Sequence, residues 1–188
     1  MEKLFDLDYN TRTFKPTVEW MVKRYNEANE KLFGGVLGEC DLGIFTTGRG
    51  SRGGVNGWFK FMNRNLHINP VTYRLYSGDI PLTYSNLIEV AKPRIELNGN
   101  KHGSEWAFMV TLVHEMCHYY VYRNGFYVRR AHGKEFTKIA KAVTQLSGGQ
   151  IEVTTHATPE RSKQMEMDNA RPRKRRVVRK KYCLKFGF

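Results

Sequence analysis

Two histidines that flank a glutamate are the residues of this chain best suited to chemistry. They belong to the segment His114-Glu115-Met116-Cys117-His118, which has the pattern H-E-x-x-H. On a helix, residues i and i+4 lie on one face about 6 Å apart, so two imidazoles there can bind one metal ion. Zinc takes nitrogen ligands at about 2.0–2.1 Å, and a catalytic zinc site leaves its fourth position for water, whose proton Glu115 can accept as a general base. The spacing therefore predicts one zinc ion per chain.

A catalytic zinc site of this kind needs a third protein ligand, and two residues are candidates. His132 lies 14 residues after His118, beyond a turn that contains Gly125 and at the start of the next predicted helix. Glu135 is its rival, because some zinc peptidases use a glutamate as the third ligand. Three positions after His132, however, Glu135 suits a capping box at the helix start. We therefore favour His132 as the ligand and expect Glu135 to support the helix or the ligands.

Helices must position these residues. The helix that carries His114 and His118 is predicted from Ser104 to Arg123, and Asn124-Gly125 ends it. A following helix begins near His132 and stops by Gly148-Gly149. The apolar residues that recur at helical spacing in the two helices are Trp106, Met109, Val113, Met116 and Tyr120, then Phe136, Ile139, Ala140 and Val143.

The rest of the folded part mixes one helix with short strands. A helix is predicted over 17–33, where Thr17 can cap the start and Gly34-Gly35 the end. The segment 94–98 alternates between polar and apolar residues, which puts Ile95 and Leu97 on one face, as in a half-buried strand. Further strands are expected at 41–45, at 54–61 and, within an otherwise loop-like stretch 62–92, at 66–68.

These residues resemble the SprT-like zinc metallopeptidases, the Spartan-related family. Three segments carry the resemblance, which spans residues 17–145. They are Asn29-Glu-Lys-Leu-Phe-Gly-Gly-Val-Leu37, then His114-Glu-Met-Cys-His118 with Tyr119-Tyr120, and Ala131-His132-Gly-Lys-Glu-Phe136.

The resemblance implies an α+β, zincin-like fold in which a small antiparallel or mixed sheet packs on the helix that carries H-E-x-x-H. It also implies peptide hydrolysis, with His114, His118 and His132 as metal ligands and Glu115 as the base. In such an arrangement we expect the strand 94–98 to be an edge that pairs with an extended substrate.

The C-terminal part departs from the family pattern. Many SprT-like proteins end in a zinc ribbon of paired cysteines, whereas Tyr182-Cys183-Leu-Lys-Phe186-Gly187 looks like one corner of a ribbon with its second cysteine replaced. We expect no second zinc. The three cysteines, Cys40, Cys117 and Cys183, are far apart and odd in number, which argues against a disulfide framework.

Positive charge is concentrated in the tail. Residues 161–188 hold 11 Lys and Arg against Glu166 and Asp168, a net charge of +9, which leaves +4 of the total of +13 for residues 1–160. We expect a metallopeptidase domain over 1–155 and a disordered basic tail over 156–188 that binds nucleic acid, DNA more than RNA, through phosphates. The basic cluster comprises Arg171, Arg173, Lys174, Arg175, Arg176, Arg179, Lys180 and Lys181.

Other features narrow the class of protein. No apolar run approaches the roughly 20 residues that span a bilayer, and Met1–Asp6 lacks the layout of a secretion signal, so we expect an intracellular protein with no membrane partner. The glycines of 48–53 fit G-x-G-x-x-G, but a strand-like segment follows them where a dinucleotide fold requires a helix.

Two functions stay open. The first is a metallopeptidase acting on proteins associated with DNA, and the second is a nucleic-acid-associated or virion structural protein with an idle zinc site.

Overall fold

The computed structural model describes residues 3–46, 56–61, 66–69, 71, 75–83, 92–101, 103–124 and 131–154. All of them fall within one compact unit, Met1–Thr155. The glycine-rich loop at 48–53 and the basic tail lie outside the described residues. The domain boundary at residue 155 and the disorder of the tail therefore stay predictions.

Helix α1 spans Val18–Phe33 and confirms the first predicted helix. The hydroxyl of Thr17 accepts a hydrogen bond from the backbone N–H of Trp20 at 3.2 Å, which caps the first turn. Gly34 ends the helix in the left-handed conformation, with φ of 64°, where a side chain would be strained. Local capping thus sets both ends of this helix.

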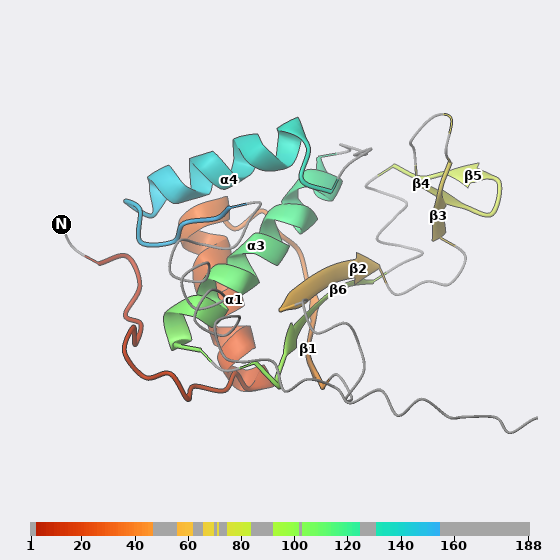
Figure 1. The fold of residues 1–188 in the computed structure, drawn as a ribbon. Coiled ribbons are helices and arrows are strands. Elements are labelled where there is room, and N and C mark those ends of the chain that lie inside the picture. The colour runs from red at the N-terminus through yellow and green to blue at the C-terminus, as the bar shows by residue number, and fades with distance from the viewer. Residues whose placement is uncertain are drawn as a thin grey trace, which may run out of the picture. The chain divides into compact units, whose positions relative to one another are not determined.

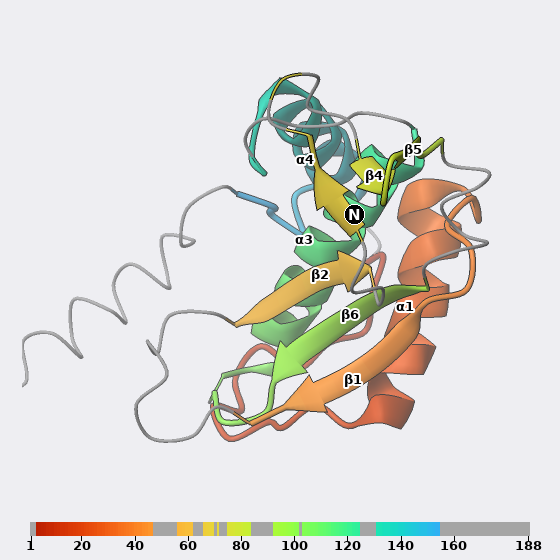
Figure 2. The same ribbon diagram turned by 90° about the vertical axis from the view of Figure 1, so that its right-hand side faces the viewer.

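The main sheet is mixed and has three strands in the described part of the chain. Strands β1 (Asp41–Phe45), β2 (Gly57–Phe61) and β6 (Pro93–Asn98) lie in the order β1-β6-β2 (Figure 2). β1 runs parallel to β6 and β2 runs antiparallel to it. The predicted α+β class is confirmed, together with a small mixed sheet.

Strand β6 is the centre of this sheet, so its predicted role as a substrate-binding edge is wrong. Its backbone groups pair with β1 on one side and with β2 on the other. A half-buried strand would expose the face opposite Ile95 and Leu97, but Glu96 on that face is only 6 % exposed. The side chains of Lys60, Arg94 and Trp58 contact its carboxylate. Alternation in one strand reports which residues share a face, but it does not report how many neighbours the strand has.

A second small sheet fills part of the stretch that the sequence analysis assigned mainly to loop. It contains β3 (Leu66–Ile68), which was predicted, and β4 (Leu75–Ser77) and β5 (Ile80–Pro81), which were not. Both pairings are antiparallel, and Gly78, with φ of 57°, lies in the turn between β4 and β5. Strands of two and three residues are too short to show a period of two, which explains the missed prediction.

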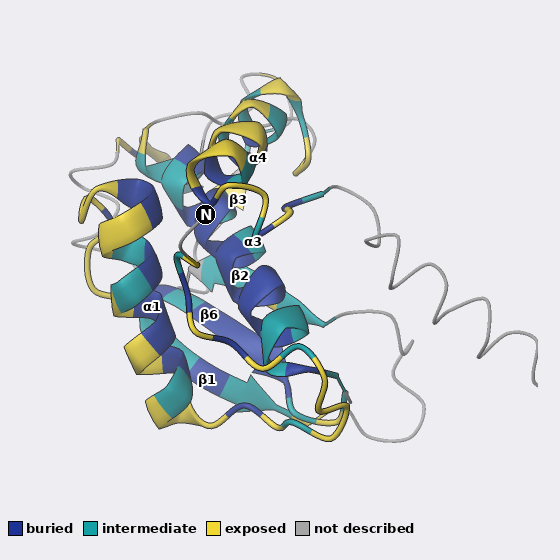
Figure 3. Ribbon diagram, turned by 90° about the vertical axis from the view of Figure 1, so that its left-hand side faces the viewer, coloured by how far each residue is buried: buried dark blue, intermediate teal, exposed yellow. Residues whose placement is uncertain are grey.

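Helices α3 (Glu105–Arg123) and α4 (Lys134–Leu146) lie on the same side of the main sheet as α1 (Figure 1). α1 and α3 lie against the strands, and α4 packs on α3. α3 is buried along most of its length, as Figure 3 shows, because it is sandwiched between the sheet and the other helices. This central position explains why α3 has apolar residues on more than one face.

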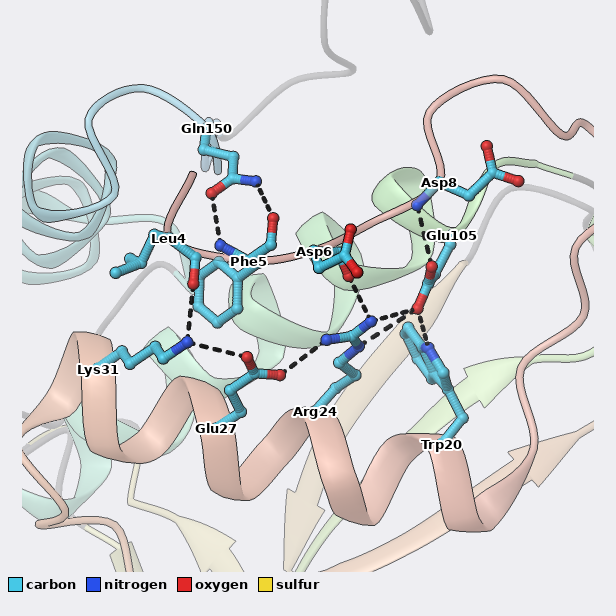
Figure 4. Close-up of polar contacts among 10 residues, drawn as sticks. All are labelled: Leu4, Phe5, Asp6, Asp8, Trp20, Arg24, Glu27, Lys31, Glu105 and Gln150. Carbon is cyan, nitrogen blue, oxygen red and sulfur yellow. Dashed lines mark hydrogen bonds and ion pairs between the residues drawn. The ribbon is translucent and has the colours of Figure 1, made fainter. Parts of the chain in front are cut away.

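A buried ion pair fastens the N-terminal segment to α1 and to the start of α3 (Figure 4). The guanidinium of Arg24 donates to the carboxylate of Glu105 at 2.7 Å and to the backbone carbonyl of Asp6 at 2.6 Å. Glu105 also accepts from the indole N–H of Trp20 at 2.7 Å and from the backbone N–H of Asp8 at 3.0 Å. One carboxylate in the first turn of α3 therefore joins three segments of the chain.

In the described part of the chain, no helix is long and apolar enough to cross a membrane.

Candidate metal centre

The two motif histidines project from the middle of α3. Ser104 caps this helix by accepting from the backbone N–H of Ala107, and the helix then continues without interruption to Arg123. His114 and His118, one turn apart, are partly buried, and their ring centroids lie 5.0 Å apart. The structure thus brings the predicted pair onto one face of the helix.

His132 reaches the same place from a segment far along the chain. It directly precedes Gly133, the residue that caps the start of α4. Its ring centroid lies 5.0 Å from those of His114 and His118, and its Nε2 atom lies 3.0 Å from Nε2 of His114. The candidate ligand atoms of the three imidazoles all lie within 4.8 Å of one another, so this group could hold a metal ion.

Glu135, the rival third ligand, does not belong to this group of side chains. The capping box suggested for it is also wrong, because Gly133 and not His132 is the capping residue, and no side chain caps this helix end. Glu135 instead lies in the first turn of α4, where its negative charge interacts favourably with the positive end of the helix dipole. Cys117, which lies between the two motif histidines in sequence, is fully buried in the core, as expected of a small apolar residue.

The environment of His118 favours a neutral ring. Burial first, and then the adjacent rings of His114 and His132, lower the pKa of His118 to about 3. An imidazole that stays neutral at pH 7 keeps a lone pair for a metal ion. The electrostatics of this histidine therefore suit a ligand.

Glu115, the residue after His114, is buried, with 6 % of its surface exposed. Burial raises the pKa of Glu115 to about 8, and a hydrogen bond from the backbone N–H of Phe59 opposes this rise in part. Apolar surroundings penalise the carboxylate because it loses hydration, and a nearby cation would favour it. A carboxyl group with a raised pKa beside a group of convergent histidines is typical of an acid–base site.

The contact with Phe59 places Glu115 at the outer side of strand β2. The N–H of Asn98 donates to the carbonyl of Asn56 at 2.8 Å, which makes these two residues a hydrogen-bonded antiparallel pair. The backbone groups of Asn56, Trp58 and Lys60 therefore face β6, and those of the residues between them face away from it. Among the described strands, none pairs with that outer side of β2.

Gly57 lets β2 lie close to the helix that carries the motif. A Cβ atom at this position would lie 3.0 Å from the side chains of Leu97 and Thr111 and 3.2 Å from the carbonyl oxygen of Glu96. A side chain at this position would therefore crowd its neighbours on β6 and α3, which would have to give by a few tenths of an ångström. The backbone of Phe59, two residues further along β2, contacts Glu115 of the same helix.

Two parts of the site were not found from the sequence. The backbone N–H of Phe59 carries no side-chain signal, since any residue but proline would supply it. Phe136 was assigned to the core, yet its ring also contacts all three histidine rings. Its position four residues after His132 was the available clue, because such residues become neighbours when a helix begins between them.

The comparison with protein families agrees with the geometry. Residues 85–157, less than half of the chain, match the model of the SprT-like family. Over these residues the chain is SprT-like. The SprT-like segment contains β6, α3 and α4, and with them the three histidines and Glu115. No curated protein matches the chain significantly.

Proposed function

We propose that this protein is a zinc-dependent metallopeptidase that acts on proteins associated with DNA. The observation that carries the proposal is the convergence of three imidazoles next to a buried glutamate at the outer side of a strand. The SprT-like segment supports a metallopeptidase-like domain. An idle structural site is less well supported, because structural zinc takes four protein ligands and needs no carboxyl group beside it.

The donor set fits zinc. His114, His118 and His132 would hold the ion with three neutral nitrogen atoms, which leaves a position for water or substrate, as in other catalytic zinc sites. A zinc ion held there would supply polarisation of the substrate carbonyl and a lowered pKa for the attacking water.

Glu115 would act as the general base. Its carboxylate would accept a proton from the attacking water and then deliver that proton to the nitrogen of the leaving peptide. The buried position of Glu115 keeps the carboxyl group in a low-dielectric environment, where interactions between charges are stronger than in water. The contact with the N–H of Phe59 would orient the carboxyl group for this step.

The substrate would bind along β2, which takes the place that the sequence analysis gave to strand 94–98. An extended peptide can add to a sheet edge by hydrogen bonding to the backbone groups that face outward. In β2 the residues with outward backbone groups are Gly57, Phe59 and Phe61, and Phe59 is the one that contacts Glu115. Main-chain pairing does not read side chains, so we expect loose sequence specificity.

Nucleic acid would be recruited by the basic tail. The eight basic residues within 171–181 accompany no base-reading motif, so their contacts would be to phosphates and indifferent to base sequence. Binding through the tail would raise the local concentration of the peptidase at proteins on DNA. This part of the proposal depends on the charge of the sequence alone.

The decisive experiment compares Glu115→Gln with Glu135→Gln. Both changes remove one carboxylate that lies close in sequence to a candidate ligand, but it is Glu115 that contacts the backbone of Phe59 in β2. We expect Glu115→Gln to keep one zinc per chain while cleavage of casein or of the protein itself falls by about 10²–10⁴-fold, the usual contribution of a general base. Glu135→Gln should keep both zinc and cleavage.

The assay is metal analysis together with gel-based cleavage, with and without DNA. Full cleavage by Glu115→Gln would show that another group is the base. A wild-type protein that holds zinc but cleaves nothing in either condition would favour the structural alternative.

A further inference from the structure

The ring of Phe136 lies against all three candidate ligands at once. Its centroid is 4.8 Å from that of His114, 4.4 Å from that of His118 and 4.8 Å from that of His132. The three imidazole centroids are themselves 5.0 Å apart in each pair. The four rings therefore form a nearly regular tetrahedron, with the phenyl ring at the apex.

Phe136 closes one side of the histidine triangle to solvent. Its side chain is 0 % exposed, whereas His132 is exposed and His114 and His118 are partly exposed. An apolar ring at the apex offers the imidazoles no hydrogen-bonding group of its own. Water and substrate must therefore approach the three nitrogen donors from the side away from Phe136.

The start of α4 puts this ring in place. Gly133 caps the helix, and Phe136 lies in its first turn, four residues after His132. The same ring thus contacts a histidine of its own segment and two histidines of α3. His132 precedes the helix and is exposed, so packing against Phe136 restrains a ring that the helix itself does not hold.

Restraint of the rings matters because the imidazole torsion χ2 is broad in proteins. Each histidine must present one nitrogen to a shared point, and ordering three rings when the metal binds would cost conformational entropy. A rigid apolar surface that orders them beforehand lowers this cost, which is the general effect of preorganisation on affinity. The apolar shell of a metal site also controls solvent access and local dielectric.

We propose that Phe136 is a positioning residue that preorganises His114, His118 and His132 for the metal ion and thereby sets the affinity and geometry of the site. The inference rests on the proposed zinc site. It goes beyond that site because it assigns metal affinity to a side chain that has no donor atom.

The test must separate this role from ordinary core packing, since Phe136 is also part of the hydrophobic core. Phe136→Leu keeps an apolar side chain but removes the flat ring that contacts the imidazoles. Val143→Ala is the matched control, because Val143 is a buried core residue of the same helix that has no aromatic ring and lies two turns further on. Circular dichroism and the melting temperature of each variant report on folding.

The full-length protein is stripped of metal, and Zn²⁺ binding is measured by competition with a chelating dye. We expect Phe136→Leu to bind Zn²⁺ about 10–100-fold more weakly than wild type, the range seen when groups that orient metal ligands are changed. Co²⁺ serves as a spectroscopic probe, and its visible absorption in Phe136→Leu should change in position and intensity because the ligand geometry relaxes. Val143→Ala should keep the wild-type affinity and the wild-type Co²⁺ spectrum.

Two results would overturn the inference while leaving the zinc site intact. One is wild-type Zn²⁺ affinity and Co²⁺ spectrum in Phe136→Leu, and the other is equal weakening in Val143→Ala. A wild-type protein that binds no Zn²⁺ would instead overturn the proposed function, and this inference with it. If Phe136→Leu does not fold, Phe136→Met takes its place with the same expectations.

Discussion

Replacing Glu105 by glutamine removes the charge that neutralises a buried arginine. The side chains of Arg24 and Glu105 are 9 % and 13 % exposed, and they form an ion pair at 2.7 Å. Glutamine has nearly the same shape, but one of its two terminal groups is a donor. Since Glu105 accepts from Arg24, from the indole of Trp20 and from the backbone N–H of Asp8, a glutamine must leave at least one of these donors facing another donor.

The expected loss of stability follows from these contacts. Breaking a buried ion pair by removing one partner costs about 3–5 kcal/mol, because the remaining charge is left uncompensated. Glu27 still pairs with Arg24 at 2.8 Å and reduces that cost, so we expect about 2–3 kcal/mol. For a protein of this size 1 kcal/mol corresponds to about 2–4 °C, so the melting temperature should fall by about 4–12 °C.

The same contact predicts a dependence on pH. Burial alone would raise the pKa of Glu105, but hydrogen bonds from Asp8, Trp20 and Arg24 outweigh it and hold the pKa below its ordinary value of 4.5. A group with a lowered folded-state pKa contributes stability above its unfolded value, and this contribution is lost as the pH falls through the folded value. Wild type should therefore lose stability on acidification below about pH 4.5, and Glu105→Gln should lose less over the same range.

The assay is thermal and urea denaturation of wild type and Glu105→Gln at pH 7 and at a series of acidic pH values. Glu30→Gln is the control, because Glu30 is an exposed carboxylate on α1 outside the ion-pair network. Its melting temperature should stay within about 2 °C of wild type, as is usual for an exposed substitution. Equal stability of wild type and Glu105→Gln at pH 7, or parallel acid profiles, would refute the reasoning.

Three further predictions concern the site and the tail. His132→Ala should lose most of the bound zinc while Glu135→Ala keeps it, as measured by metal analysis, and the opposite result would make Glu135 the third ligand. Gly57→Ala should destabilise the fold by about 1–3 kcal/mol and reduce peptide cleavage, because its Cβ would crowd Leu97 and Thr111. An unchanged unfolding midpoint and an unchanged cleavage rate would disprove the close packing of β2. Deletion of 161–188 should remove most DNA affinity while cleavage of a short peptide persists. The deletion should also flatten the fall of log affinity with log salt concentration, which steepens by about 0.9 for each duplex phosphate neutralised. Equal affinity and equal salt dependence of the full-length and truncated proteins, measured at two salt concentrations, would reject this role of the tail.

The sequence predicted what depends on neighbours along the chain. The helices were located almost to the residue, because Thr17, Gly34 and Ser104 mark their ends through local capping. The pairing of His114 and His118 on one face followed in the same way, since helix geometry fixes the separation of residues i and i+4.

Predictions that involved long-range contacts were less secure. The edge role of strand 94–98 was wrong, because its sequence alternates in the same way whether one neighbour or two lie beside it. The choice between His132 and Glu135 could be argued from sequence, but only the packing of α4 on α3 brings the ring of His132 to the other two.

What the sequence by itself determined is therefore the set of helices and the chemical types of the candidate site residues, which depend on short-range geometry and on side-chain chemistry. Only the tertiary structure decided that β6 is central, that the outer side of β2 meets Glu115, and that Phe136 lies under all three histidines. The contact between His114 and His132 joins residues 18 positions apart, and the contact between Phe59 and Glu115 joins residues 56 positions apart. The periodicity of a local sequence segment does not predict contacts at such separations. They arise because the apolar face of each helix or sheet is buried against another element, and close packing determines which elements fit together.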